Sequence, residues 1–401
     1  MTWKKAKLKD CCVSIADGDH QPPPKADAGV PFVTISNIDA FNTLSFENAM
    51  HVPREYYDGL DPKRRATTGD VLYSVVGSFG IPVLIKDDAP FVFQRHIAIL
   101  RPDKSLLDSR FLYYTMRSKD FYHLADAAAI GAAQRTISLS ALKNLEIPLP
   151  PLPVQRRIAD ILSAYDDLIE NNRKQIKLLE EAAQRLYKEW FIDLRFPGHE
   201  HTPIINGVPE GWAVVPLKDL VEFNPPIEQT NDSLKQFIPM DAISESNMLI
   251  DDRKISVTNK NCGSKFKHGD TLFARITPCL ENGKTAFVFK TKMGKYAVGS
   301  TEFIVLRAKE ISPYMVYLMA RMESFREYAI NSMTGSDGRQ RVQIDKLKIY
   351  SAFRPAKLQI ERFSSEVSSM FFDIDKLAEK CARLSEARDC LLRKLMKRGI
   401  E

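Results

Sequence analysis

Two stretches of the chain repeat apolar residues at alternating steps of four and three positions. This spacing keeps the apolar side chains on one face of an α-helix and is typical of a coiled-coil seam. The first stretch, residues 154–190, would form a helix roughly 55 Å long, and the second lies in residues 357–397. The seam positions are Ile158, Leu162, Tyr165, Ile169, Asn172, Ile176, Leu179, Ala183, Leu186 and Trp190, and then Phe363, Val367, Met370, Ile374, Leu377, Cys381, Leu384, Arg388, Leu391 and Leu395.

The two seams are in register along their whole length. Each member of the second lies 205 residues after its counterpart, from Ile158 and Phe363 to Trp190 and Leu395. A single seam is more often a core helix of a bundle. Two matched seams favour an antiparallel pair that buries both, because a domain of about 150 residues is too small to cover helices of this length. Such a pair would hold the globular parts of the chain apart like a ruler.

Each seam follows a segment with short β-type runs broken by turn residues, and then a stretch with apolar residues at helical spacing. In the first segment the predicted elements are strands at 31–35, 71–76, 91–93 and 97–100 and a helix at 109–124. In the second they are strands at 271–274, 285–289 and 302–306 and a helix at 314–328. Both segments therefore predict a mixed α+β domain.

Shorter landmarks also recur in the same order in both halves of the chain. They are Trp3 and Trp212, Gly69-Asp70 and Gly269-Asp270, and Gln134-Arg135 and Gln340-Arg341. The Gly-Asp pairs predict a turn that enters a strand, with glycine in a left-handed conformation and aspartate capping the turn. The predicted architecture is two tandem α+β domains separated by two long antiparallel coiled-coil helices, with pseudo-twofold symmetry. The predicted boundaries are 1–150 and 199–355 for the domains, and 151–198 and 356–401 for the helices.

Composition narrows the class without fixing the function. The 401 residues include 57 basic and 51 acidic side chains, a net charge of +6, which is compatible with nucleic-acid binding but does not establish it. The six cysteines form no C-x-x-C pair, and the chain has no apolar run long enough to span a membrane. We therefore expect a cytoplasmic protein with reduced cysteines, no bound metal and no membrane contact.

Three fragments resemble enzyme motifs but lack a required residue. Asn224-Pro225-Pro226-Ile227 is similar to the base-holding motif of adenine methyltransferases, except that Ile227 replaces the aromatic residue. Gly283-Lys284-Thr285 resembles the end of a phosphate-binding loop, yet Pro278 stands where the earlier glycine is needed. His199 and His201 have no further ligands at metal-binding spacing. We interpret these fragments as two turns and a linker, so no catalytic residue is predicted.

The two Gln-Arg pairs are better candidates, here for DNA binding. They lie in loops of small and polar residues, which let the backbone approach a ligand, and both side chains suit hydrogen bonds with base edges or phosphates. An ordinary solvated arginine is the alternative at either site. The full set of candidates is Arg64, Arg65, Ser74, Gln94, Arg95, Gln134, Arg135, Lys265, Lys267, Arg275, Lys284, Arg339, Gln340 and Arg341.

The whole chain resembles the specificity subunits of type I restriction-modification systems. The most specific part is the proline-rich connector and helix start at 147–159, continuing through 169–172 and 186–191, which is similar to the central conserved region of that family. The second connector, residues 353–359, departs from the Pro-Leu-Pro pattern of the first.

The resemblance implies a DNA-recognition subunit without catalytic activity. Its two target recognition domains would each read one half of a bipartite, asymmetric double-stranded DNA sequence through the major groove, and the helices would set the spacer. Two modification subunits would methylate adenine, and restriction subunits would translocate and cleave DNA; AdoMet, ATP and Mg²⁺ would be bound by those partners. Two other classes stay open. The first is a coiled-coil scaffold, which would have no DNA sequence specificity. The second is a self-contained methyltransferase–nuclease fusion, which would require complete versions of the enzyme motifs that lack a residue in this chain.

Overall fold

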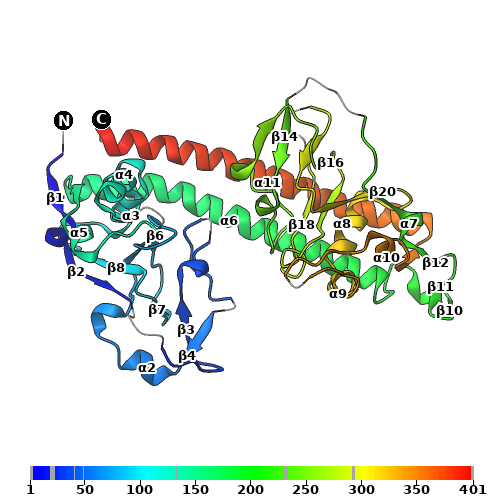
Figure 1. Cartoon of the computed structure of the whole chain (residues 1–401), viewed down its shortest axis with the longest axis horizontal. Coiled ribbons are helices and arrows are strands. Elements are labelled where there is room, and N and C mark those ends of the chain that lie inside the picture. The colour runs from blue at the N-terminus through cyan, green and yellow to red at the C-terminus, as the bar shows by residue number, and fades with distance from the viewer. Residues whose placement is uncertain are drawn as a thin grey trace. The chain divides into compact units, whose positions relative to one another are not determined.

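The computed structural model describes residues 3–18, 23–39, 41–47, 49–131, 134–228, 234–290, 294–336 and 338–398. The chain divides into two compact units, the first made of Met1–Ile169 and Arg383–Glu401 and the second of Glu170–Ala382. Each unit has a globular part and a portion of each of two long helices, α6 (Leu152–Phe191) and α11 (Lys357–Arg398) (Figure 1). The boundaries predicted from the sequence separate the globular domains from the long helices. The two units are defined by contacts instead, so each includes part of both helices.

Two larger sheets and one separate pair of strands form the first unit. Its strands are β1 (Lys5–Lys7), β2 (Cys12–Asp17), β3 (Val30–Val33), β4 (Met50–Val52), β5 (Val71–Ser74), β6 (Pro82–Leu84), β7 (Val92–Phe93), β8 (Ile97–Pro102) and β9 (Glu146–Pro148). One sheet is antiparallel with the order β2-β8-β5-β6. In the other, with the order β4-β3-β7, β3 is antiparallel to β4 and parallel to β7. The separate pair β1-β9 ties the start of this unit to the residues just before α6.

The four-stranded sheet of the first unit is buried on both faces. Because side chains alternate along a strand, Val71 and Tyr73 of β5 point to one core and Leu72 points to another. The first core also contains residues of α3 (Ser109–Arg117), α4 (Lys119–Ala128) and the first turns of α6, whereas the second lies between the two sheets. The other helices of this unit are α1 (Leu8–Cys11), α2 (Arg54–Asp58) and α5 (Leu139–Asn144).

The second unit repeats this topology. Its strands are β10 (Ile204–Ile205), β11 (Val208–Pro209), β12 (Ala213–Pro216), β13 (Val221–Phe223), β14 (Lys235–Ile238), β15 (Ser256–Thr258), β16 (Ser264–Phe266), β17 (Thr271–Ala274), β18 (Thr285–Phe287), β19 (Ala297–Gly299), β20 (Phe303–Ala308) and β21 (Ser351–Arg354). The sheet β13-β20-β17-β18 corresponds to the four-stranded sheet of the first unit, and β12-β21 corresponds to β1-β9. The other sheet, β15-β14-β19-β16, keeps the antiparallel and parallel pairs of the first unit and adds β16 at its edge.

The helices of the second unit follow the same order. They are α7 (Leu217–Leu220), α8 (Pro313–Arg321), α9 (Glu323–Asn331) and α10 (Ile344–Lys348). Leu272 and Val305 lie in the core between the sheets, whereas Phe273 and Ile304 face the core shared with α8 and α9. The mixed α+β class predicted from the sequence is therefore confirmed for both units.

One prediction about the helices was wrong in both units. The single helix expected at 109–124 is broken at Ser118, and the one expected at 314–328 is broken at Met322; both residues have extended backbones, with ψ of 148° and 135°. The Ser118 hydroxyl accepts a hydrogen bond from the Phe121 amide at 3.2 Å and so caps α4. The apolar pattern did not indicate either break, because the helices on both sides of each break pack into the same core.

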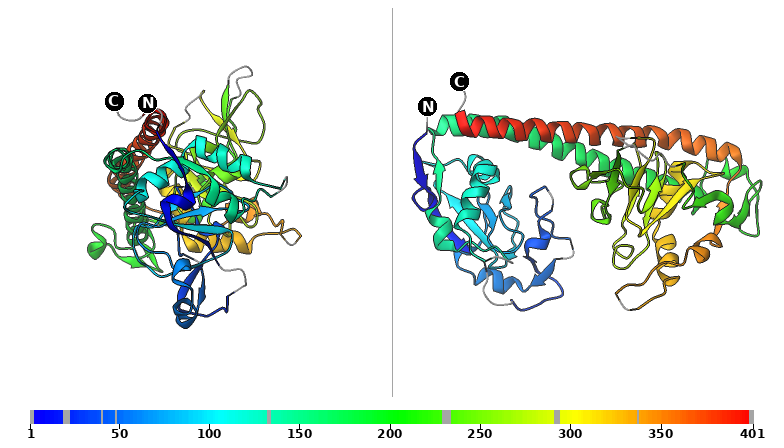
Figure 2. Two further views of the ribbon diagram at one scale, coloured as in Figure 1. Left: turned by 90° about the vertical axis from the view of Figure 1, so that its left-hand side faces the viewer. Right: turned by 45° about the horizontal axis from the view of Figure 1, so that its top comes forward.

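All the predicted seam positions of α6 and α11 are buried or half-buried. In the second unit the Phe363 ring lies 5.5 Å from the Trp190 ring and 6.0 Å from the Tyr187 ring, measured between centroids. Farther along, Cys381 of α11 contacts Asn172 of α6, so the two portions run antiparallel in this unit. Figures 1 and 2 show these portions side by side. Seam residues such as Ile158 also belong to the cores of the globular parts. These residues are therefore buried by the globular parts as well as by the other long helix.

Candidate nucleic-acid interface

The turn at Gly69-Asp70 has the structural role predicted for it. Gly69 has a φ of 94°, in the left-handed region that favours glycine. The Asp70 carboxylate accepts a hydrogen bond from the Thr67 amide at 2.9 Å and forms a two-pronged ion pair with Arg101, at 3.0 and 2.8 Å. Asp70 is only 2% exposed. These contacts fix the start of β5.

The second unit contains the same turn. Gly269 has a φ of 84°, and the Asp270 carboxylate accepts from the Lys267 amide at 2.8 Å. Arg307 binds both carboxylate oxygens of Asp270, at 2.8 and 2.7 Å. Both Gly-Asp pairs are therefore parts of the scaffold.

At the other end of β5, the backbone of residues 75–77 lies between two loops. The Val75 amide donates to the His96 carbonyl at 2.8 Å, and the Gly77 amide donates to the Arg135 carbonyl at 3.3 Å. This arrangement brings together the β7–β8 turn and the loop before α5. Four predicted candidates therefore share one end of the first unit: Gln94, Arg95, Gln134 and Arg135. Arg95 and Gln134 are exposed, and the other two are half-buried.

Arg65 does not join this group, whereas the Arg64 side chain reaches toward it. Arg65 lies near the Asp70 end of β5, where its carbonyl accepts from Arg101 at 2.8 Å. The Arg65 guanidinium binds the carbonyl oxygens of Leu60 and Asp58, which ties it to its own loop. The Arg64 guanidinium lies 3.8 Å from the carboxylate of Asp17, which pairs with Ala98 close to the β7–β8 turn. The structure therefore separates Arg65, but not Arg64, from the loops that carry the other candidates.

The prediction that Ser74 contacts DNA was wrong. Its side chain is fully buried, and its hydroxyl accepts a hydrogen bond from the Ile81 amide at 2.8 Å. It therefore closes the β5–β6 hairpin and presents no group to the surface.

The second unit gathers its candidates in the corresponding place. The Arg275 amide donates to the Glu302 carbonyl at 2.9 Å, and the Thr277 amide donates to the Gln340 carbonyl at 3.1 Å. Lys284 lies at the same end, because its carbonyl accepts from the Ala274 amide at 3.1 Å. The candidates that share this end of the unit are Arg275, Lys284, Arg339, Gln340 and Arg341.

Two lysines of the second unit lie elsewhere. Lys267 is at the Asp270 end of β17, opposite the loops. Lys265 belongs to β16, where it pairs with Val298, and its side chain is half-buried. Neither residue joins the cluster around Arg341.

The Gln-Arg pairs of the two units are offset by one residue, contrary to the predicted repeat. Thr136 bridges to Ile130 in the first unit, whereas Arg341 bridges to Thr334 in the second, so Arg341 corresponds to Thr136. The loop between the bridged positions has five residues in the first unit (131–135) and six in the second (335–340). The extra residue moves the second arginine to the next position, whose side chain points in another direction. Ala132, Ala133 and Asp337 of these loops lie outside the described residues.

Each arginine is paired with a carboxylate from a different element. Arg135 binds Asp126 of α4, with Nε and Nη2 at 2.8 and 2.7 Å from Oδ1. Arg341 binds Glu302 of the β19–β20 turn, with Nε at 3.0 Å and Nη2 at 2.7 Å from Oε1. The Glu302 carboxylate raises the pKa of the Arg341 guanidinium, which stays charged at every physiological pH.

The sequence prediction missed His96 and Glu302. They occupy equivalent positions, since the carbonyls of both accept the amide that follows β5 or β17. Burial, and then the neighbouring Arg95 charge, lower the pKa of His96, so its imidazole is neutral near pH 7. Only the proximity of His96 to Gln94 and Arg95 in the sequence could have indicated it.

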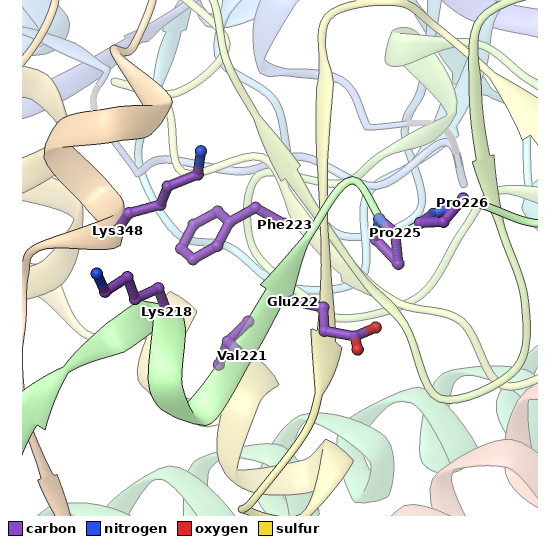
Figure 3. A pocket seen from close by; sticks show the side chains of 7 residues that line it. All are labelled: Lys218, Val221, Glu222, Phe223, Pro225, Pro226 and Lys348. Atoms are coloured by element: carbon purple, nitrogen blue, oxygen red, sulfur yellow. The ribbon is translucent and has the colours of Figure 1, made fainter.

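Two of the three motif-like fragments have structural roles in a sheet and a turn, and the third contains the short 3₁₀ helix His199–His201. Asn224 follows β13, and its side-chain oxygen accepts from the Val305 amide at 2.8 Å, so this group is used within the sheet. The adjoining hollow has a volume of 390 Å³ and is open to solvent; Figure 3 shows Lys218 and Lys348 beside the Phe223 ring and the two prolines at the end of the strand. Gly283 forms a turn, with its amide donating to Leu280 at 2.8 Å.

Two features are absent from the residues that the structure describes. Within them, no group of three or more His, Cys, Asp or Glu side chains is arranged to hold a metal ion. No helix within this part of the chain combines the length and apolar character needed to cross a membrane.

Comparison with known proteins points to one family. Residues 2–181 match the model of the type I restriction modification DNA specificity domain. The putative type I restriction enzyme MjaX specificity subunit of Methanocaldococcus jannaschii is 30% identical over 226 residues, covering 54% of this chain and 52% of that protein. The EcoEI specificity subunit of Escherichia coli is 30% identical over 194 residues, 47% of this chain and 32% of its own length. The matched stretch is thus about half the length of the first relative, and less of the second.

A solved structure is similar over the full chain. The crystal structure of the type I restriction-modification system S subunit from M. genitalium has a TM-score of 0.57 and 17% sequence identity, covering 100% of this chain and 97% of that one. At this identity, the likeness concerns the fold alone. The domain match and the related sequences confirm the resemblance to the specificity subunits of type I restriction-modification systems that the sequence predicts.

Proposed function

We propose that this chain is the DNA sequence-specificity subunit of a type I restriction-modification enzyme. The observation that carries the proposal is the match of residues 2–181 to a DNA specificity domain, followed by a second unit of the same topology. In each unit a rigid sheet presents loops with basic and amide side chains at one end. Loops on a rigid scaffold are suited to reading base edges, because the scaffold fixes the geometry of the contacts.

In this proposal each unit reads one half of a bipartite, asymmetric DNA target through the major groove. α6 and α11 act as a ruler, and the two units are related by pseudo-twofold symmetry. Half-sites one turn of DNA apart are separated by roughly 35 Å. A helix of 40 residues is about 60 Å long, which is enough to set that spacing.

Catalysis would belong to partner subunits. Two modification subunits would bind AdoMet and methylate adenine, and restriction subunits would use ATP and Mg²⁺ for translocation and cleavage, all in the cytoplasm. The chain itself would contribute recognition without catalysis. Its modest net charge of +6 is compatible with this role, because the partners can supply additional phosphate contacts.

The test is a map of methylated adenines in cells that express the cognate modification subunit with and without this chain. We expect one bipartite methylated motif that depends on the chain, and salt-sensitive DNA binding by the purified complex. The chain alone should show no methyltransferase, nuclease or ATPase activity. Methylation by the chain alone, or a complex whose methylation does not depend on the chain, would contradict the proposal. Binding of the modification subunit without any DNA specificity would instead support a scaffold.

A further inference from the structure

The Arg341 guanidinium has one edge bound and one edge free. Nε and Nη2 bind the Glu302 carboxylate at 2.7–3.1 Å. Among the described residues, Nη1 makes no hydrogen bond, and Nη2 has none beyond its bond to Glu302. The Arg341 side chain is 43% exposed. The free edge, with one N–H from Nη1 and one from Nη2, is therefore available to a ligand with two adjacent acceptors.

Hydrogen bonds hold the backbone in place at both Arg341 and Glu302. The Arg341 amide donates to the Thr334 carbonyl at 2.9 Å, and the Thr334 amide donates back at 3.1 Å. The Glu302 carbonyl accepts from the Arg275 amide at 2.9 Å, and its own amide donates to the Ser300 hydroxyl at 3.2 Å. Because both backbones are held, the ion pair with Glu302 orders the Arg341 side chain before any ligand arrives. This order lowers the entropy cost of binding.

The charge of the pair selects among ligands. A lone arginine attracts any phosphate, but the Glu302 carboxylate cancels its charge and would repel an approaching phosphate. The hydrogen-bond geometry of the free edge is unaffected. An uncharged partner with two acceptors side by side is therefore favoured, and the O6 and N7 atoms of guanine in the major groove have this arrangement.

We propose that Glu302 is a positioning residue for DNA recognition, which holds Arg341 so that its free edge binds O6 and N7 of one guanine in the half-site read by the second unit. The inference rests on the proposed function, because it needs that unit to enter the major groove. The first unit is not equivalent. There, Nη2 of Arg135 also donates to the Asp126 carbonyl, so less of the corresponding edge is free.

The test compares the recognised motif of four complexes, each with the full chain and its modification subunit. They contain the wild-type chain, Arg341→Ala, Glu302→Gln, and Asp126→Asn as the matched control in the first unit. In Arg341→Ala and in Glu302→Gln, we expect the preference of the complex for one guanine of the wild-type motif over other bases to fall at least tenfold. Asp126→Asn should leave discrimination at that base pair unchanged. A complex that recognises no motif even with the wild-type chain would instead be a failure of the proposed function.

A base analogue separates readout of guanine from a phosphate contact or a structural role. Replacing that guanine by 7-deazaguanine removes N7 and should weaken wild-type binding, with little further effect on Arg341→Ala. If Glu302→Gln instead binds all sequences more tightly and relaxes none, Arg341 contacts phosphate and the inference is wrong. It is equally wrong if Arg341→Ala, a change at a half-exposed side chain, retains the full motif. Should Glu302→Gln lower the melting temperature, Arg341→Lys, which cannot form the two-pronged contact, replaces it and should relax the same position.

Discussion

The two units agree at one end of their central strand and differ at the other. At the start of β5 and β17, a glycine, a buried aspartate and a paired arginine, Arg101 or Arg307, recur with the same hydrogen bonds. At the far end, His96 takes the place of Glu302 and the arginines are offset by one residue. Residues that hold the sheet have thus stayed the same between the repeats, whereas loop residues have changed. In a protein that reads two different half-sites, sequence preference would reside in the second group.

The largest effect is expected at the shared end. Asp270→Ala leaves the Arg307 guanidinium unpaired and the Lys267 amide without its acceptor, in a site where the carboxylate is 1% exposed. Breaking a buried pair in this way costs about 3–5 kcal/mol. Urea unfolding followed by tryptophan fluorescence measures the loss, because Trp190 and Trp212, two of the three tryptophans, lie in the second unit.

Asp70→Ala is the matched variant in the first unit. It should cost less, because the Arg101 side chain is 26% exposed and the Arg307 side chain is 16% exposed. Combining Asp270→Ala with Arg307→Met should recover part of the loss, since no unpaired charge remains. A cost below 1 kcal/mol for Asp270→Ala would show that this turn is not what holds the repeated sheet together.

A smaller effect, on DNA binding, is expected at the end where the units differ. Arg135→Ala and Arg341→Ala should each weaken binding by the complex by about 1–3 kcal/mol, because under the proposed function each would remove contacts to one half-site. Melting temperatures should stay close to that of the wild type, since both side chains are about 40% exposed. Arg354→Ala, which removes an exposed, ion-paired arginine on β21, is the control. Normal binding by both variants would mean that these loops are structural.

The units also differ in how a carboxylate of α6 meets the globular part. In the first unit Asp166 accepts from the Tyr114 hydroxyl at 2.7 Å and pairs with Arg388 of α11 at 2.5 Å. In the second, Glu180 is 3% exposed and accepts from the Tyr317 hydroxyl at 2.6 Å. Burial raises the pKa of Glu180 above its ordinary value, so the folded protein holds this proton more tightly than the unfolded chain does.

The sign of the resulting pH dependence follows from that shift. As the pH rises from the ordinary glutamate pKa through the raised one, the stability from the protonated form is lost, with a slope of at most about 1.4 kcal/mol per pH unit. Glu180→Gln keeps a neutral hydrogen-bonding group and should remove this slope. Unfolding free energies of both proteins between pH 4 and pH 7, roughly the range above the ordinary glutamate pKa, test it. Parallel curves for the two proteins would contradict the expected proton uptake.

Much of the fold could be predicted from the sequence where a pattern extends over many residues. The seams of α6 and α11 were recognisable because the same period is kept through each helix, and the match of Ile158 with Phe363 exposed the repeat. The breaks at Ser118 and Met322 were not recognisable. Apolar residues continue across both, since the flanking helices bury their faces in one core, so periodicity cannot separate two short helices from a long one.

The candidate site was less accessible to sequence reasoning. The burial of Ser74 depends on β5 lying between two cores, which no local pattern reveals. The match of the Gln-Arg pairs was misleading, because one additional loop residue places Arg341 opposite Thr334 and beside Glu302. That carboxylate is 39 residues away in the sequence, so only the fold brings the pair together.

The smallest expected effect on stability concerns the two helix breaks, at Ser118 and Met322. Ser118→Ala removes the hydroxyl that accepts from the Phe121 amide and donates to the Thr115 carbonyl at 2.7 Å, and the loss of such a cap costs about 1 kcal/mol. Met322 has no side-chain cap at the matching break, so Met322→Ala tests packing alone. Hydrogen exchange of the Phe121 amide should become roughly fivefold faster in Ser118→Ala, as about 1 kcal/mol implies, and remain slow in Ser118→Asn, which restores an acceptor. Unchanged exchange in Ser118→Ala would mean that packing, rather than the cap, sets the break in the first unit as it does in the second.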